Sequence, residues 1–143
     1  MAALDPTGLF DRPLIPVASE ADARITRDAI LPYLADASST VILVHVIKQS
    51  EGGIDPSPLD VQEEEAERLF GIATQGRDGL VIETQYAYGS NAAESILETA
   101  RETDASVVAI APRKRSLFMR LLTGETTRPL MANPDVPVLS IPQ

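Results

Sequence analysis

The sequence lacks cysteine, contains a single histidine, His45, and has no long apolar run among its 143 residues. Without cysteine there are no disulfides, thiolate nucleophiles or cysteine-ligated metals, and one histidine cannot build a multi-histidine site. No segment approaches the roughly 20 consecutive apolar residues of a membrane span, and the N-terminus carries acidic residues where a signal peptide would be basic. These absences predict a soluble, cytoplasmic protein with no metal site and no membrane insertion.

Positive charge is also scarce, because 21 acidic residues outnumber 12 basic ones and the formal net charge is −9. Nucleic-acid affinity depends mainly on lysine and arginine neutralising phosphates, so this balance predicts no nucleic-acid partner. An apolar content of 44% is enough for one core in a chain of this length. We expect one domain over residues 1–143, with a loose N-terminal segment at 1–11 and an exposed loop at 49–58.

Apolar runs alternate with helical patterns from end to end. The runs predict strands at 13–17, 40–47, 80–88, 106–111 and 136–141, and the helical spacing predicts helices at 21–37, 60–73, 91–100 and 126–133. Asp60 with Glu63 resembles a capping box, Asn91 with Glu94 predicts a second helix start, and Pro32 predicts a kink in the first helix. Helical crossovers between buried strands favour an α/β fold, a parallel sheet with helices on both faces.

In open sheets of this kind a ligand binds beyond the carboxyl ends of the strands, where the strand order reverses. Here that edge is predicted to comprise residues 18–20, 46–48 and 111–124. The last segment concentrates Arg113, Lys114, Arg115 and Arg120 in an otherwise acidic chain. These side chains either hold an anion, dock an acidic partner surface or balance nearby carboxylates, and the sequence leaves all three interpretations open.

The sequence contains no recognisable catalytic motif. His45 lies within an apolar run, which is typical of a satisfied core or sheet-edge histidine and not of a general base. Ser19, Ser90 and Ser116 lack the Gly-x-Ser-x-Gly elbow of an activated nucleophile. We therefore expect no enzyme activity, with slow nucleotide hydrolysis as the alternative.

Five short motifs, taken in order, carry a resemblance to a known family. They are Leu14-Ile15-Pro16-Val17 before a helix, Val44-His45-Val46-Ile47 at a strand end, Tyr88-Gly89 before a helix, the strand at 104–110, and Arg120-Leu121-Leu122-Thr123-Gly124 leading to Pro137-Val138-Leu139-Ser140-Ile141-Pro142. Together they resemble the universal stress protein family over nearly the whole chain. The resemblance implies an adenine nucleotide alpha hydrolase-like fold with a single open sheet of five parallel strands in the order 3-2-1-4-5. It also implies a homodimer formed through the last strand.

One class of that family binds ATP with a Gly-x-x-Gly motif followed, after a fixed spacer, by Gly-Ser or Gly-Thr. Glycine lets backbone N–H groups approach the phosphate oxygens closely. The matching positions here are Ala111, Lys114, Gly124 and Glu125, so most of the motif is lost. A carboxylate at a phosphate site is unfavourable unless a cation intervenes. In addition, Ala18 stands where the binding class usually has an aspartate that contacts the nucleoside.

The resemblance gives two sets of candidate residues. A nucleotide or anion site would comprise Pro16, Val17, Ala18, Val46, Ala111, Arg113, Lys114, Gly124, Glu125, Thr126 and Thr127, and the dimer interface would comprise Val136, Val138, Leu139 and Ile141. Val46 matches a residue near the adenine, although a valine in a buried strand is also ordinary core. Thr126 and Thr127 either offer hydroxyls to a ligand or cap a short helix. Pairing of the last strand with its copy would cover a bare sheet edge.

The family resemblance and the degenerate glycine motif together predict a stress-response or regulatory binding module that is not an ATP binder of the usual kind. No cofactor is firmly predicted, and ATP is the one to test. One alternative is an ATP-binding member that uses basic side chains as its phosphate cradle. Another is a soluble regulatory subunit of a membrane transporter. A protein partner would dock at the basic loop 113–120, or at the acidic segment 49–67 if that segment is more than solvated surface.

Overall fold

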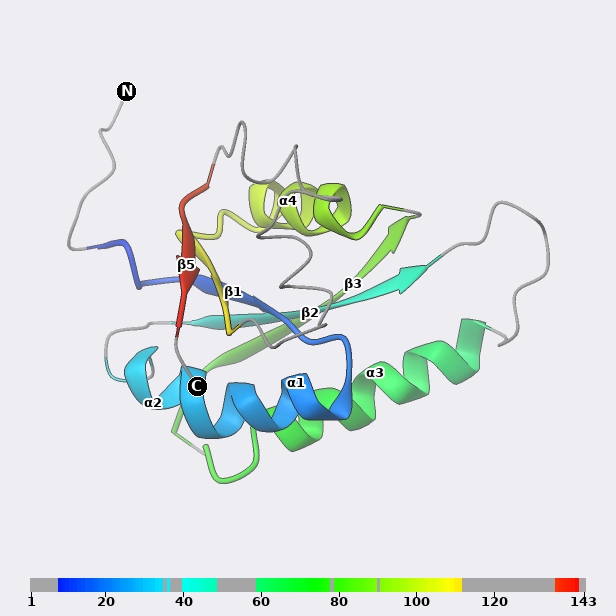
Figure 1. Cartoon of the computed structure of the whole chain (residues 1–143), viewed down its shortest axis with the longest axis horizontal. Coiled ribbons are helices and arrows are strands. Elements are labelled where there is room, and N and C mark those ends of the chain that lie inside the picture. Colours follow the sequence, from blue (N-terminus) through cyan, green and yellow to red (C-terminus); the bar gives the residue numbers. More distant parts are fainter. Residues whose placement is uncertain are drawn as a thin grey trace.

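The computed structural model describes residues 8–34, 36, 40–48, 59–77, 79–89, 91–111 and 136–141. Within them, the strands are β1 (Pro13–Pro16), β2 (Val41–Lys48), β3 (Ile82–Gly89), β4 (Val107–Ile110) and β5 (Val138–Ser140). They form one parallel sheet in the order β3-β2-β1-β4-β5. Figure 1 shows α4 (Ala92–Glu102) on one face of this sheet and α1 (Glu20–Ile25) and α3 (Leu59–Ala73) on the other. The predicted α/β class and strand order are confirmed.

Strand β2 shows why the sheet is covered on both faces. Val41 and Leu43 belong to the core cluster beneath α1 and α3, whereas Ile42 and Val44 belong to the cluster beneath α4. Successive side chains of a strand point to opposite faces, so a strand with two buried faces needs a nearly continuous apolar run. Strand β2 pairs in parallel with β1 on one side and with β3 on the other, so the carboxyl ends of the strands lie at the same end of the sheet.

The first helical region differs from the regular helix predicted over 21–37. Helix α1 ends at Ile25, a π-helical segment, η2, covers Thr26–Ile30, and α2 covers Leu31–Leu34. Pro32 has no N–H to donate to the carbonyl four residues before it, so the regular helical hydrogen-bond ladder is interrupted at this position. The chain widens instead into a π-turn, in which the Leu31 N–H donates to the Thr26 carbonyl. The predicted irregularity is confirmed, and the uninterrupted helix is wrong.

Two helix starts test the predicted caps. The Asn91 side chain accepts from the N–H groups of Ala93 and Glu94, at 3.0 and 3.3 Å, so this cap is confirmed. Helix α3 begins at Leu59, which places Asp60 inside the first turn, so the capping box predicted there is wrong.

The last residues of the N-terminal segment 1–11, which is predicted to be loose, lie within the described part of the chain. The Asp11 N–H donates to the Gly8 carbonyl at 3.1 Å, and Phe10 packs against the core cluster beneath α1 and α3. The exposed loop at 49–58 and the helix at 126–133 lie outside the described residues.

Arg12 joins three elements at the amino-terminal end of the sheet. Its backbone N–H donates to the Ser106 hydroxyl at 2.9 Å. Its guanidinium donates to the Thr103 carbonyl at 2.8 Å and to the Glu83 carboxylate at 3.3 Å. The Arg12 side chain thereby links the start of β1 to the end of α4 and to β3 at the amino-terminal end of the sheet.

Candidate functional site

The turn from β1 into α1 lies at the carboxyl end of the sheet, where the ligand site is predicted. Ser19 caps α1, because its hydroxyl accepts from the Asp22 N–H at 3.2 Å. The Asp22 carboxylate returns to the turn and accepts from the Ala18 N–H at 3.1 Å. This reciprocal capping uses N–H groups that a bound anion would otherwise need. The carboxylate at the start of α1 therefore belongs to the chain itself, to Asp22, whose side chain is buried at 6% exposure.

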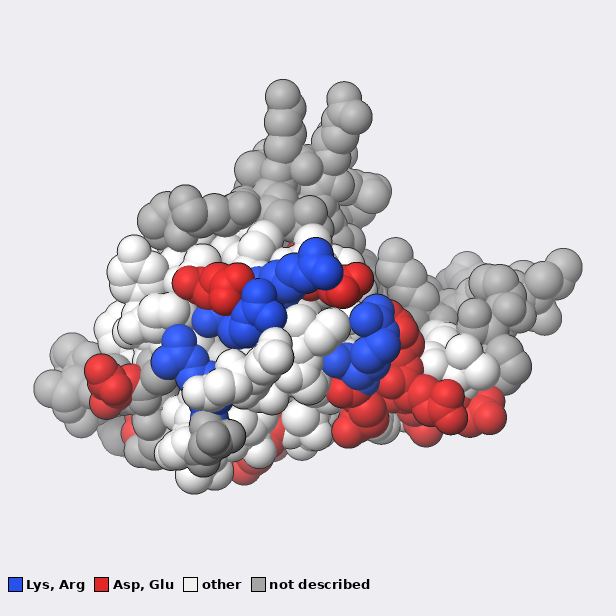
Figure 2. Space-filling view, turned by 90° about the horizontal axis from the view of Figure 1, so that it is seen from below, with Lys and Arg blue, Asp and Glu red and all other residues white. Residues whose placement is uncertain are grey.

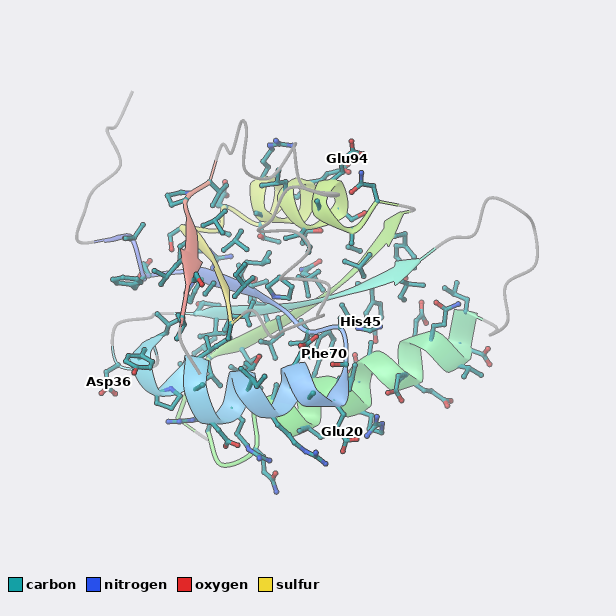
Figure 3. All side chains as sticks on the ribbon, in the orientation of Figure 1. Glu20, Asp36, His45, Phe70 and Glu94 are labelled. Atoms are coloured by element: carbon teal, nitrogen blue, oxygen red, sulfur yellow. The ribbon has the colours of Figure 1, made fainter. Side chains whose placement is uncertain are left out.

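His45 connects β2 to the same turn. Its Nδ1 lies 2.7 Å from the Val17 carbonyl oxygen, and because a carbonyl only accepts, Nδ1 carries the proton in this contact. The Val17 N–H donates to the Val44 carbonyl at 2.8 Å, so both polar main-chain groups of Val17 are used. His45 is thus a satisfied histidine at the sheet end, as predicted. Figure 3 shows His45 and Phe70 in the layer between the sheet and α3.

A cavity of about 10 Å³ lies beside this turn, between the carboxyl ends of β1 and β4. Its lining residues are Pro16, Asp22, Ile25, Thr26, Ile30 and Ala111. A space of this size holds about one water molecule and is far too small for a nucleotide base. The predicted residues Pro16 and Ala111 are brought together here, beside Asp22 and Thr26, which sequence reasoning missed. The Ser19-x-x-Asp22 spacing is a capping-box signal from which Asp22 could have been found.

The other predicted site residues are distributed differently. Ala18 is exposed, with its N–H on Asp22. Val17 lies in the core beneath α1 and α3, whereas Val46 packs against the core beneath α4, so the two side chains lie on opposite faces of the sheet. The remaining predicted residues, Arg113, Lys114, Gly124, Glu125, Thr126 and Thr127, lie outside the described residues.

The last strand uses part of the predicted dimer interface for its own core. Val136 and Ile141 are 8% and 5% exposed within the single chain. Val138 and Leu139 are half-buried and pack against opposite core clusters. The chain alone therefore leaves Val138 and Leu139 as the partly accessible apolar side chains of this strand, and the interface stays a prediction.

Charged side chains on the α1 and α3 face pair with one another. Figure 2 shows this face, with acidic side chains gathered along α3 and basic ones beside them. Arg68 lies 2.6 Å from Glu65 and 3.9 Å from Glu20, and Arg24 lies 2.8 Å from Glu20. The hydrogen bond from Arg68, together with its charge, holds the pKa of Glu65 below its ordinary value against the opposing effect of burial. Arg24 and Arg68 thus already have carboxylate partners and do not form a ready anion site.

The described part of the chain offers neither a membrane span nor a metal centre. Within it, no helix is both long and apolar enough to cross a bilayer. The same residues contain no cluster of three or more histidine, cysteine, aspartate or glutamate side chains that could hold a metal ion.

Comparison with known proteins gives a family and a set of structural neighbours. The profile of the universal stress protein family matches residues 10–142. A universal stress protein family member from Burkholderia pseudomallei is 27% identical, with a TM-score of 0.69 over 96% of this chain and 100% of that one. None of the curated proteins matches the chain.

Two more distant structures were solved with nucleotides. The universal stress protein from Archaeoglobus fulgidus in complex with dAMP is 18% identical, with a TM-score of 0.56 over 93% of this chain and 98% of that one. A universal stress protein family protein from Arabidopsis thaliana with AMP bound is 15% identical, with a TM-score of 0.56 over 93% of this chain and 91% of that one. At these identities the two structures support the fold alone.

Proposed function

Because this chain belongs to the universal stress protein family, we propose that it is a regulatory binding module that does not hold ATP in a glycine-rich cradle. The observation that carries the proposal is the self-capped turn after β1. Asp22 accepts from the Ala18 N–H at 3.1 Å, and Ala18 itself has no carboxylate to offer a nucleoside. A ligand at this turn would have to displace an existing hydrogen bond of a buried carboxylate, which opposes binding.

The phosphate side of the site supports the same proposal. Ala111, at the position of the first motif glycine, is 4% exposed and lines the small cavity beside Asp22. Its Cβ occupies space that a glycine would leave for the close approach of phosphate oxygens. In the sequence, Lys114 and Glu125 replace two further motif positions. The chain therefore lacks the groups that hold ATP at both ends of the nucleotide.

Calorimetric titration with ATP and Mg²⁺ tests this proposal, after confirming that no nucleotide copurifies with the protein. We expect no binding heat from the unchanged chain. The triple variant Ala18→Asp/Lys114→Gly/Glu125→Ser restores family residues and should gain measurable ATP affinity. The matched control is Lys114→Gly/Glu125→Ser, which leaves the β1 turn unchanged and should gain less. One-to-one micromolar binding of ATP by the unchanged chain would overturn the proposal.

A second candidate function is binding of an adenine nucleotide with a single phosphate. It is favoured by the relatives of the same fold that were solved with dAMP and AMP, and by Val46, which is kept near the expected adenine position. A single phosphate needs fewer contacts than the ATP tail, and arginine and lysine side chains can provide them. Arg113 and Lys114 are the residues proposed for this role.

Titration with AMP tests the second candidate. The double variant Arg113→Ala/Lys114→Ala should weaken AMP binding by about tenfold or more, since each charge-assisted contact contributes on the order of 1.5–3 kcal/mol. The control is Arg77→Ala, in the turn after α3 at the opposite end of the sheet, which should leave AMP binding unchanged. Equal affinity in all three proteins would exclude the basic side chains as the phosphate site.

We propose further that two copies of the chain pair through β5. The strand is three residues long, lies at the sheet edge, and leaves Val138 and Leu139 half-buried in the single chain. A dimer would bury both side chains and cap the bare edge. Light scattering at micromolar concentration should give the dimer mass for the unchanged chain and for Val81→Lys, an exposed position away from β5, but the monomer mass for Val138→Lys. A monomer of the unchanged chain would exclude the dimer.

A further inference from the structure

Strand β3 forms the other edge of the sheet and is much longer than β5. It has eight residues and pairs with β2 on one side only. The Val41 N–H donates to the Val81 carbonyl at 2.9 Å, so the backbone groups of alternate residues from Val81 onward face β2. Those of Ile82, Thr84 and Tyr86 therefore face outward, and no strand within the described residues pairs with them. Such an edge is a template for another strand.

A polar hollow of about 200 Å³ lies beside this edge, between β3 and α4. Its walls include the segment Tyr86–Tyr88 and the α4 side chains of Ser95, Glu98, Thr99 and Glu102. The tyrosine side chains turn toward α3, where the Tyr86 hydroxyl donates to Glu67 at 2.5 Å and the Tyr88 hydroxyl to Glu63 at 2.9 Å. The tyrosines therefore contribute main chain to the hollow, where an added strand could bond.

Ser95 brings a buried hydroxyl to this hollow. The residue is 7% exposed and lines the hollow, and its hydroxyl has no hydrogen-bond partner among the described residues. Gly89 leaves the space for it, because a Cβ at Gly89 would overlap the Ser95 hydroxyl oxygen. The neighbouring Thr99 hydroxyl, in contrast, donates to the Ser95 carbonyl at 2.8 Å. Because buried hydroxyls are generally hydrogen-bonded, the Ser95 hydroxyl can bond to a polar group that enters the hollow.

Two carboxylates give the hollow its charge. Glu98 and Glu102 lie one turn apart on α4, line the hollow, and make no hydrogen bond or ion pair with any other described residue. Like charges at this helical spacing repel each other, and a cation between them would relieve the repulsion. On the α3 side, Glu63 and Glu67 carry the same sign next to β3. The edge is thus bracketed by negative charge from both helical layers.

We propose that the outer edge of β3 binds an extended basic segment of a partner protein, whose main chain pairs with β3 and whose lysine or arginine side chain enters the hollow beside Ser95, Glu98 and Glu102. Strand addition satisfies the outward backbone groups, and the basic side chain complements the carboxylates. A second copy of this chain does not fit, because it would bring the same carboxylates face to face. This site is separated by β2 from the turn after β1 and is independent of the function proposed above.

Fluorescence anisotropy with defined peptides tests the proposal. The probe is a fluorescein-labelled peptide of four Lys-Val repeats, compared with four Glu-Val repeats, four Lys-Pro repeats and free spermidine. The Glu-Val peptide lacks the charge, the Lys-Pro peptide cannot pair as a strand, and spermidine supplies only the cation. We expect the Lys-Val peptide to bind at least about tenfold more tightly than each of the others. Equal binding of the Lys-Pro peptide or of spermidine would overturn the strand pairing.

Variants locate the binding on the molecule. Glu98→Gln/Glu102→Gln should weaken binding of the Lys-Val peptide by about tenfold or more, because it removes both charges of the hollow. The control is Glu94→Gln, on the exposed start of the same helix and outside the hollow (Figure 3), which should not change binding. Thr84→Pro removes an outward N–H without touching the bonds to β2 and should also weaken binding. Circular dichroism confirms that each variant is folded.

Amide hydrogen exchange distinguishes strand pairing from charge attraction alone, because charge attraction would not protect specific backbone amides. The Lys-Val peptide should slow exchange at the outward amides of Thr84 and Tyr86 and leave β5 unchanged. Unchanged binding by Glu98→Gln/Glu102→Gln, or slowed exchange at β5 and not at β3, would overturn the proposal.

Discussion

The two ends of the parallel sheet are held together by bonds of very different span. At the amino-terminal end, Arg12 bonds to residues 71, 91 and 94 positions away in the sequence. At the carboxyl end, the caps of Ser19, Asp22 and Asn91 join residues at most 4 positions apart. A bond between distant residues forms only in the assembled sheet, whereas a cap forms with its own helix. We therefore expect Arg12 to stabilise the tertiary structure more than the caps do, and we expect the carboxyl end to vary its ligand chemistry without unfolding the protein.

Substitution of Arg12 should have the largest effect. Arg12→Ala removes a charge-assisted bond to the Thr103 carbonyl and the contact with Glu83, and should lower the free energy of unfolding by about 2–3 kcal/mol in urea denaturation. Arg12→Lys keeps the charge but not the planar guanidinium, so its free energy of unfolding should lie between those of the unchanged protein and Arg12→Ala. The control is Arg24→Ala, which breaks an exposed pair with Glu20 and should cost about 0.5 kcal/mol or less. If Arg12→Ala and Arg24→Ala lowered the free energy of unfolding equally, the proposed difference between the two ends of the sheet would be wrong.

At the carboxyl end, removal of the Asp22 cap should cost less. Asp22→Ala leaves the Ala18 N–H without its acceptor, and we expect a loss of about 1–2 kcal/mol in the same denaturation assay. Asp22→Asn keeps an acceptor oxygen and should recover most of the loss. If Asp22→Ala instead destabilised the protein more than Arg12→Ala, the local bonds would be carrying the tertiary stability and the contrast between the ends would be wrong.

The same difference in span explains what could be predicted from the sequence. Helix α4 and its Asn91 cap were predictable, because apolar spacing and a cap followed by an acidic residue are local signals. The strand order came from the family resemblance, and the Ser19-x-x-Asp22 spacing could have revealed the capped turn. The partners of Arg12 could not be predicted, because they meet it only after the sheet has assembled.

The π-helical turn and the β3 edge were also beyond prediction. Pro32 indicates a break, but the energies that separate a kinked α-helix from a π-turn depend on how the neighbouring segments pack. The buried hydroxyl of Ser95 becomes notable only when Gly89, from a different element, is placed against it. Sites that depend on contacts between residues of different elements can be identified only from the structure.

His45 makes a long-range side-chain bond at the carboxyl end, in contrast to the local caps there. Its bond to the Val17 carbonyl spans 28 residues and joins β2 to the end of β1. His45→Phe keeps a ring of similar shape but leaves the half-buried carbonyl without a side-chain donor, so we expect a loss of about 1 kcal/mol. Thermal unfolding monitored by circular dichroism measures it. No loss at all would mean that water replaces the imidazole there and that the His45 side chain adds no stability to the backbone bond between Val17 and Val44.

Bonds of intermediate span join β3 to α3, and their contribution to stability should be lost only at high pH. The hydrogen bond to Glu67, 19 residues away, together with burial and the nearby carboxylate charges, raises the pKa of Tyr86 to about 12 from an ordinary value of 10.0. Because the folded-state pKa is the higher one, this bond contributes its full stability below pH 10, and that contribution is lost as the pH rises through about 12. Ultraviolet titration of tyrosinate should therefore show Tyr86 ionising near pH 12, and Glu67→Gln should move the Tyr86 pKa back toward 10.0. If Glu67→Gln left the titration unchanged, the bond between Tyr86 and Glu67 would not persist in solution. At this point β3 would then be held by its ladder with β2 and by apolar packing, with no contribution from the Tyr86 hydroxyl.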